Sequence, residues 1–163
     1  MIDYIIQLLS NISPHLATFL IAILPIIELR GAIPIGMTFY SLPWYLVYFW
    51  AVLGNIVSAI IVFFFLEKVS GFLIKHSKFF EHFFNWFFSR TRKRHKIKIE
   101  RFKDFALLLF VAVPLPITGS WTGCLIAFVF GIPFKKALTM ISLGVMIAGA
   151  IVLLATVGAI SIL

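Results

Sequence analysis

The chain has 163 residues, of which 62% are hydrophobic, 17% aromatic and only 12% charged. An ordinary soluble domain has about 45–50% apolar and about 25% charged residues, so this composition excludes that class and indicates a single integral membrane domain. The formal net charge of +8 comes mainly from residues 68–103, which contain eleven Lys or Arg and two Glu. Such a local excess of basic residues is interpreted first as a signal of membrane topology and only second as a binding site.

The first unusual stretch is Leu24–Pro34 (LPIIELRGAIP), which places a carboxylate and a guanidinium two residues apart in very apolar sequence. Charges inside a membrane are rare because they are costly there, and they usually face a cavity or a charged partner. Pro25 and Pro34 each remove a backbone donor and disfavour helix in the preceding residue. We therefore predict a break in a membrane helix with Glu28 and Arg30 at the break. The alternative is an ion pair that only stabilises packing.

Apolar segments of two lengths follow one another along the chain. Residues 14–24 and 35–40 flank the break, and at about 1.5 Å per residue neither crosses a hydrocarbon layer about 30 Å thick. Two short segments around a break predict a re-entrant hairpin, which must be surrounded by protein or a water-filled cavity. Residues 44–66 carry no charge and are long enough to span. Three aromatic residues at the start of this span suit a membrane-interface belt: Trp44, Tyr45 and Tyr48.

Residues 71–89 predict a different kind of helix. Phenylalanines recur every four residues and polar residues occupy the opposite arc, which is typical of an amphipathic helix lying in the headgroup plane. A basic run at residues 90–96 follows, and we interpret it by the positive-inside rule and attraction to anionic lipid rather than as a nucleic-acid site. The residues expected at the membrane surface are Phe79, Phe83, Phe87, Arg90, Arg92, Lys93 and Arg94.

The second half repeats the order of elements in the first. A short apolar run at residues 105–113 ends in PLPITGSWTG at residues 114–123, a short run returns to Phe130, and residues 137–163 are long enough to span. At an offset of 90, Ala22 aligns with Ala112, Pro43 with Pro133, Gly54 with Gly144, Glu28 with Thr118 and Arg30 with Ser120.

These segments predict an all-α integral membrane protein built as an inverted repeat. Each half is a re-entrant helical hairpin followed by one full transmembrane helix, so each half crosses the membrane an odd number of times. The expected parts are repeat 1 at about 14–67, a cytoplasmic, basic, amphipathic interfacial linker at about 68–103, and repeat 2 at about 104–163. With the basic residues in the cytoplasm, both termini lie outside. Two spans enclose little core, which suggests a homodimer.

Residues 25–34 and 113–123 also carry a resemblance to a known family. Over most of residues 15–160 the chain resembles the putative small multidrug export family of bacterial and archaeal membrane proteins. That family is distantly similar to the DedA membrane proteins, which have paired re-entrant hairpins and are associated with proton-dependent transport and with lipid movement between leaflets. The second break here has no charged residue, whereas DedA proteins carry arginine in their second half. The resemblance implies transport in the cell (plasma) membrane of a bacterium or archaeon.

Inverted repeats with discontinuous helices are typical of secondary transporters, whose site lies where the breaks meet near the bilayer midplane. Burial favours the neutral form of Glu28 and Arg30 favours the charged form, a balance that suits proton coupling. A helix beginning after Gly119 would direct its positive end into the same cavity, which with Arg30 would suit an anionic headgroup.

Two sets of candidate residues follow from these considerations. Thr118 is expected to cap the returning helix, and Trp121 either lines the cavity or packs. The candidates for substrate binding or proton coupling are Glu28, Arg30, Thr118, Ser120, Trp121 and Thr122. The candidate helix-breaking residues are Pro25, Gly31, Pro34, Pro114, Pro116, Gly119 and Gly123.

The first functional hypothesis is a small, proton-coupled secondary transporter. The alternatives are a DedA-like translocase or scramblase of an anionic, phosphate-bearing lipid, and a non-transport membrane scaffold. The sequence contains no Walker loop, Ser-His-Asp set or paired carboxylates, so no enzyme chemistry is predicted. A lone Cys124 and four scattered histidines predict no metal site and no cofactor. The expected partners are anionic lipid headgroups at the cytoplasmic face and a small-molecule or lipid substrate, with no nucleic acid.

Overall fold

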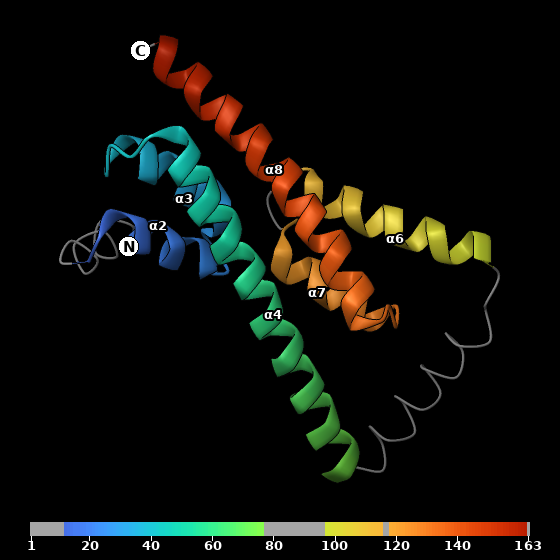
Figure 1. Ribbon diagram of the computed structural model, residues 1–163. Helices are drawn as coiled ribbons and strands as arrows, with labels where there is room; N and C mark the ends of the chain where they lie inside the picture. Colours follow the sequence, from blue (N-terminus) through green and yellow to red (C-terminus); the bar gives the residue numbers. More distant parts are fainter. Residues whose placement is uncertain (1–11, 77–96, 116–117, 163) are drawn as a thin grey trace.

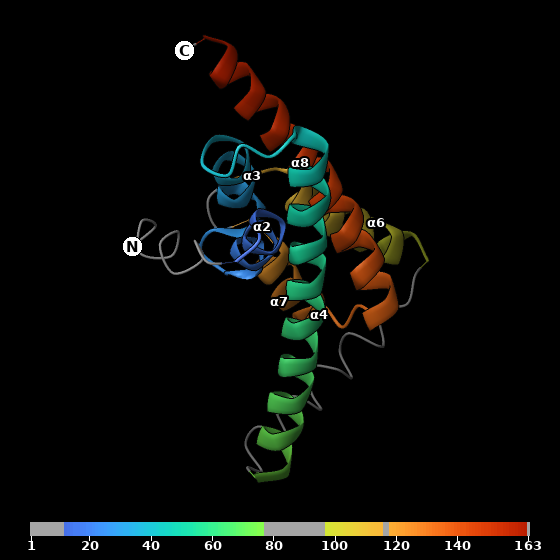
Figure 2. The same ribbon diagram turned by 60° about the vertical axis from the view of Figure 1, so that its left-hand side comes forward.

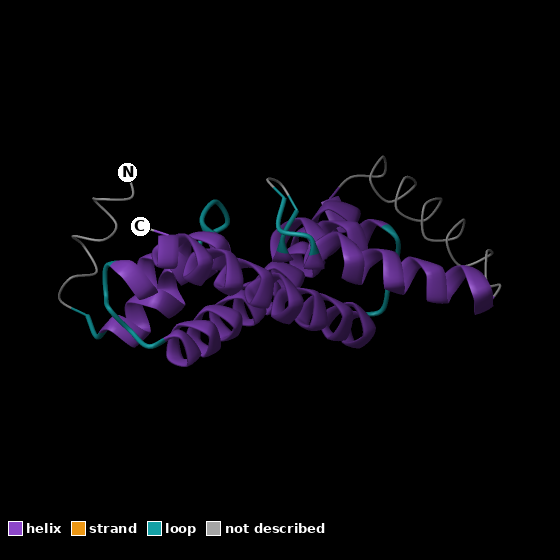
Figure 3. Ribbon diagram, turned by 90° about the horizontal axis from the view of Figure 1, so that it is seen from above, coloured by secondary structure: helices purple, strands orange, loops and turns teal. Residues whose placement is uncertain are grey.

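A computed structural model describes residues 12–76, 97–115 and 118–162, and every regular element within these ranges is an α-helix (Figure 1). Viewed from above, the described residues form only helices and the loops that join them (Figure 3). The all-α prediction is therefore confirmed for this part of the chain. In chain order the helices are α2 (Pro14–Ile23), α3 (Glu28–Thr38), α4 (Trp44–His76), α6 (Ile97–Ala112), α7 (Ser120–Val129) and α8 (Phe134–Ile162).

Helices α4 and α8 are the two described helices that are long and apolar enough to cross a membrane. They contact each other and run in opposite directions in both side views (Figures 1 and 2). Large apolar side chains on both are exposed, including Phe65 at 64% and Leu154 at 72% of their surface. Because a soluble monomer rarely exposes such extended apolar surface, these faces indicate a membrane protein.

Two helix ends differ from those expected from hydrophobicity alone. Helix α4 continues past Leu66 to His76, and α6 begins at Ile97 rather than near Phe105. Each extension contains four Lys, Arg, Glu or Leu residues, which favour helix, so the helices can extend beyond the apolar runs. The remainder of the predicted amphipathic helix and the basic run lie outside the described residues, including Phe79, Phe83, Phe87, Arg90, Arg92, Lys93 and Arg94.

The short helices that lead into the breaks pack against the long helices through glycines. Helix α2 lies against α4, where a Cβ on Gly54 would approach the Phe19 carbonyl oxygen to 2.5 Å. Helix α6 lies against α8, where a Cβ on Gly144 would approach the Leu108 carbonyl oxygen to 2.9 Å. Each glycine therefore permits a close helix contact that a side chain would push apart.

The contacts between helices have a matched arrangement in the two halves. Helix α3 contacts α4 and α8, and α7 likewise contacts α8 and α4. Helix α2 contacts α3 and α4, and α6 contacts α7 and α8. The long helices also contact each other, and the Tyr48 hydroxyl donates a hydrogen bond to the Met146 carbonyl at 2.9 Å. Tyr48 thus joins α4 to α8, whereas Trp44 and Tyr45 are exposed at the start of α4.

The connections inside the two halves differ in length. Residues 24–27 join α2 to α3, whereas the longer connection 113–119 joins α6 to α7. The alignment at an offset of 90 therefore holds for the starts of α4 and α8 but shifts in the short helices. Ala22 against Gly54 corresponds to Val111 against Gly144, and the start of α3 at Glu28 corresponds to the start of α7 at Ser120.

Candidate functional site

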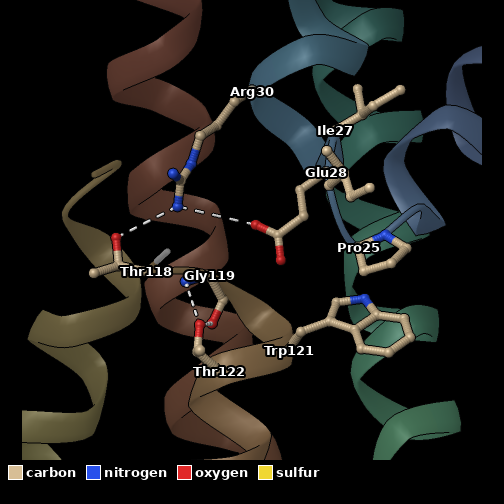
Figure 4. Close-up of a pocket in the computed structure, with 9 residues that line it drawn as sticks. Pro25, Ile27, Glu28, Arg30, Thr118, Gly119, Trp121 and Thr122 are labelled. Atoms are coloured by element: carbon tan, nitrogen blue, oxygen red, sulfur yellow. Dashed lines mark hydrogen bonds and ion pairs between the residues drawn. The ribbon is translucent and has the colours of Figure 1, made fainter. Parts of the chain in front are cut away.

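The two breaks meet at a cavity of about 240 Å³ (Figure 4). One side comes from the connection before α3 and from its first turn, and the other from the end of the second connection and the start of α7. The structure thus brings together residues about ninety positions apart in the sequence. The lining residues are Pro25, Ile26, Ile27, Glu28, Arg30, Thr118, Gly119, Trp121 and Thr122.

Glu28 occupies a backbone conformation that is unusual for its residue type. Its φ angle is 49°, in the left-handed region that favours glycine and costs other residues about 1–2 kcal/mol. The residue is nevertheless only 6% exposed, and its side chain points toward the second break (Figure 4). Strained backbone of this kind often occurs at functional sites, so the outlier supports a role for the Glu28 carboxylate.

The Glu28 carboxylate lies at the amino-terminal end of α7. It accepts hydrogen bonds from the backbone N–H groups of Ser120 and Trp121. The buried Ser120 hydroxyl donates to Oε1 of Glu28 at 3.4 Å. The first N–H groups of a helix have no partner within the helix, and its dipole favours a negative charge there. Glu28 therefore caps a helix that belongs to the other half of the chain.

Gly119 makes this capping possible. A Cβ at position 119 would overlap both carboxylate oxygens of Glu28, so the carboxylate occupies space that a side chain would fill. Gly119 has extended backbone, with φ at −177°, and precedes the first residue of α7. Its N–H donates a hydrogen bond to Thr122 Oγ1 at 3.1 Å, which satisfies one more donor at this helix start.

Arg30 extends from the first turn of α3 to the second connection. Its Nη1 donates to the carbonyl oxygen of Leu115, and its Nη2 lies 3.4 Å from Thr118 Oγ1. Nη2 also lies 3.9 Å from Oε2 of Glu28, a loose ion pair in which the Arg30 side chain is 26% exposed and that of Glu28 is 8% exposed. On a regular helix, residues two apart face away from each other, and the left-handed backbone of Glu28 changes this geometry.

Thr118 differs from its expected role as a helix cap. Its hydroxyl lies 2.7 Å from the Val113 carbonyl and 2.8 Å from the Leu115 carbonyl, and it accepts from the Leu115 N–H at 3.0 Å. These bonds stabilise the connection before α7. The start of α7 is capped by Glu28 and Thr122 instead, because the Glu28 carboxylate already fills the position next to Gly119.

The predicted helix-breaking residues fall into two groups. Pro25, Pro114 and Gly119 lie in the connections, while Gly31, Pro34 and Gly123 lie inside helices. Pro34 lies inside α3 and lacks the N–H that would otherwise bond to the Arg30 carbonyl. Gly123 instead provides space beside Val111, 2.7 Å from where its Cβ would lie. Pro116 lies outside the described residues.

Backbone carbonyls were the part of the site that sequence reasoning missed. The Leu115 carbonyl accepts from Arg30, and the carbonyls that end α2 accept from α4. Asn55 Nδ2 donates to Ala22 and Ser58 Oγ donates to Ile23, each at 3.1 Å. The only sequence signal for these contacts was a polar Asn and Ser within an apolar span, since buried polar side chains require partners.

Trp121 lines the cavity, which is one of the two positions expected for it from the sequence. Its indole ring lies on the side of Pro25, below the Glu28 carboxylate in Figure 4. Ser120 is buried and is not among the residues that line the cavity, and its hydroxyl donates a hydrogen bond to Oε1 of the lining residue Glu28. The site therefore combines one carboxylate, one guanidinium, hydroxyls and a helix start, and these groups can bind an ion or exchange a proton.

Comparison with known proteins identifies a family. The model of the family described as "Putative small multi-drug export protein" matches residues 28–151, which include both sides of the cavity. No curated protein and no solved structure matches the chain.

Proposed function

Because the chain belongs to the putative small multi-drug export protein family, we propose that it is a proton-coupled secondary transporter whose substrate site is the cavity between the breaks. The observation that carries the proposal is the position of Glu28, a buried carboxylate from one half bound to the helix start of the other. Two discontinuous segments meeting at a binding cavity are typical of secondary transporters.

Proton coupling is supported by the two sets of donors that Glu28 binds. The ionised carboxylate accepts from the start of α7 and pairs with Arg30 across 3.9 Å. Protonation removes the negative charge, weakens both interactions and leaves the donors available for a substrate that accepts hydrogen bonds. Among the described residues that line the cavity, Glu28 is the only carboxylate. The same groups would then bind either the ionised Glu28 or the substrate, which links the two events.

An inverted repeat with re-entrant hairpins is the architecture we propose for this transporter. Its support is the opposite direction of α4 and α8 and the matched helix contacts of the two halves (Figures 1 and 2). Helices α2 and α7 have 10 residues each, about half the length needed to cross a membrane. In an inverted repeat, one half can move against the other, so that a central site opens alternately to the two sides of the membrane.

A position near the bilayer midplane is supported by the partners of the first break. The end of α2 is hydrogen bonded to Asn55 and Ser58, which lie near the middle of the apolar window Trp44–Ser70 of α4. Backbone carbonyls at this depth need protein partners because lipid provides none. In the proposed topology, residues 68–103 are cytoplasmic and both termini are outside, as the charge distribution favours.

Transport measurements on Glu28→Gln test the proposal. The full-length protein is reconstituted into liposomes that contain a pH-sensitive dye, and two probes are supplied under a proton gradient: decyl phosphate as an anion and ethidium as a cation. We expect the wild-type protein to move at least one probe together with protons. Glu28→Gln keeps the shape of the side chain but cannot ionise, so the proton signal should disappear and probe movement should lose its pH dependence.

Glu67→Gln is the matched control, since Glu67 is an exposed carboxylate on α4 away from the cavity. This variant should transport at the wild-type rate with unchanged pH dependence. Wild-type rates and pH dependence in Glu28→Gln would exclude Glu28 as the coupling residue. Absence of movement of both probes through the wild-type protein would count against transport itself.

A further inference from the structure

Arg30 lines a second cavity, to which Glu28 does not contribute. This cavity is an apolar groove of about 520 Å³ between α3 and α8. On α3 it is bordered by Arg30, Pro34 and Thr38, and along α8 it extends from Ile151 to Ile160. Among the described residues that line the groove, Arg30 is the only charged one, and it also lines the polar cavity between the breaks.

We propose that the groove and the polar cavity form one site for an amphiphilic anion of drug size. The single negative group binds at Arg30, and the apolar body lies in the groove between α3 and α8. This inference rests on the proposed transport function and specifies its substrate class. A volume of about 520 Å³ lies within the range of pockets that bind drug-sized ligands, about 300–1,000 Å³.

The charges of the site favour an anion over a cation. The Glu28 carboxylate is already bound by Arg30, the Ser120 hydroxyl and two backbone N–H groups, so a cation would have to compete with all of them. A guanidinium has five N–H donors. Two of the described acceptors of Arg30 are distant, at 3.4 Å and 3.9 Å. A carboxylate or phosphate group can replace these long contacts with shorter, charge-assisted ones.

The groove suits the rest of such a molecule because its long side is apolar. Helix α8 presents Ile151 and Ile160, each more than 40% exposed, along a face that is available to hydrocarbon. Thr38 and Thr156 do not need a ligand, since each hydroxyl bonds to the carbonyl four residues earlier in its own helix. An apolar body can therefore reach the groove from the bilayer and place its charged end at Arg30.

Photolabelling of the full-length protein tests the site without a proton gradient. The probe is dodecyl phosphate with a terminal diazirine, and the protein is held in phosphatidylcholine nanodiscs. After irradiation, mass spectrometry compares labelling of residues 151–160 with labelling of the exposed Phe64 and Phe65 of α4. We expect residues 151–160 to be labelled in excess of α4, and this excess to fall at least five-fold with added decyl phosphate. Decyltrimethylammonium at the same concentration should not reduce it.

Four variants separate the charge from the groove. Arg30→Gln should lower the labelling of residues 151–160 about ten-fold, as expected for loss of one charge-assisted contact. Arg30→Lys should retain part of it. Ala155→Trp fills the groove and should abolish specific labelling, whereas Ala150→Trp, an equally exposed position of α8 outside the groove, should not.

Several results would overturn the inference. Equal labelling of α4 and α8 would exclude a specific groove site, and equal protection by decyltrimethylammonium would exclude anion preference. Protection by inorganic phosphate as strong as by decyl phosphate would show that the apolar body makes no contribution. Protection by phosphatidylglycerol alone would assign the groove to a two-chain lipid. Because labelling requires binding only, specific labelling with no proton movement would contradict the coupling at Glu28 and leave this inference standing.

Discussion

The two breaks of the chain satisfy their backbone groups in different ways. The first connection, residues 24–27, follows α2, whose last carbonyls accept hydrogen bonds from Asn55 and Ser58 of α4. The second connection, residues 113–119, is longer, and the α8 positions that correspond to Asn55 and Ser58 are Val145 and Ala148, whose side chains cannot donate such hydrogen bonds. Its Val113 and Leu115 carbonyls accept hydrogen bonds from its own Thr118, and the Leu115 carbonyl also accepts from Arg30 of the first half.

This difference shows that two halves with matched helix contacts can contribute different functional groups to the site. The glycine contacts of α4 and α8 are alike, but the first half provides both charges of the site and the second half provides their partners. Glu28 caps α7, and Arg30 holds the connection before it. The first break therefore depends on α4, whereas the second depends on the first break.

Among the variants that test whether the second break depends on the first, Glu28→Ala should have the largest effect. The change leaves the start of α7 without its cap and Arg30 without its carboxylate. Breaking a buried ion pair costs about 3–5 kcal/mol, and we expect about 3 kcal/mol here because Arg30 is partly exposed. Thermal unfolding in mild detergent, followed by circular dichroism, measures the loss.

Two companion variants calibrate this loss of stability. Glu28→Gln retains an acceptor oxygen and should lose less than Glu28→Ala. Glu67→Ala removes an exposed carboxylate and should change the free energy of unfolding by no more than about 0.5 kcal/mol. If Glu28→Ala were as stable as Glu67→Ala, α7 would not need the charge from the other half.

The local features of this arrangement could be predicted from the sequence. Apolar length predicted the two long helices, prolines predicted both breaks, and the charged pair marked the first of them. Glu28 and Arg30 do meet residues 118–122 at one cavity, because each break must bury its polar groups away from lipid. The candidate roles of these residues in transport stay predictions until they are measured.

The partners within the site could not be predicted from the sequence. Periodicity does not determine that Glu28 adopts a φ of 49°, or that its carboxylate fills the space beside Gly119. Both depend on contacts between distant segments. The alignment also assumed that the two connections have the same length, so it paired Glu28 with Thr118. In the structure, Glu28 begins α3 and Ser120 begins α7, so these two residues correspond. Thr118 was expected to cap α7 because threonine favours helix starts, but Glu28 provides that cap.

Glycine variants test the close helix contacts, which are alike in the two halves. Gly54→Ala and Gly144→Ala each place a Cβ against a backbone carbonyl of the adjacent short helix, at 2.5 Å and 2.9 Å. Overpacking of this kind costs about 1–3 kcal/mol, and we expect the greater loss at Gly54 because its contact is closer. The same unfolding measurement applies.

Gly158→Ala on α8 is the control for both glycine variants. No atom lies within 4 Å of its added Cβ, so the better helix propensity of alanine should leave stability unchanged or raise it by up to about 1 kcal/mol. Equal stability of all three variants would show that α2 and α6 do not pack closely on the long helices. A loss at only one of Gly54 and Gly144 would contradict the matched packing.

The smallest of these effects is expected for Thr118→Val, which tests how the second connection is held. Valine keeps the shape of threonine but removes the oxygen that lies within 3.0 Å of Val113 and Leu115 backbone atoms. Each lost hydrogen bond contributes about 1 kcal/mol, and we expect a total loss of about 1–2 kcal/mol. Thr139→Val is the control, because its exposed hydroxyl bonds to the Lys135 carbonyl of its own helix, and it should cost about 0.5 kcal/mol or less.

Arg30 keeps its bond to the Leu115 carbonyl, so photolabelling in Thr118→Val should remain above that in Arg30→Gln. Labelling as low as in Arg30→Gln would show instead that Thr118 positions the guanidinium, and that the second connection contributes directly to the site.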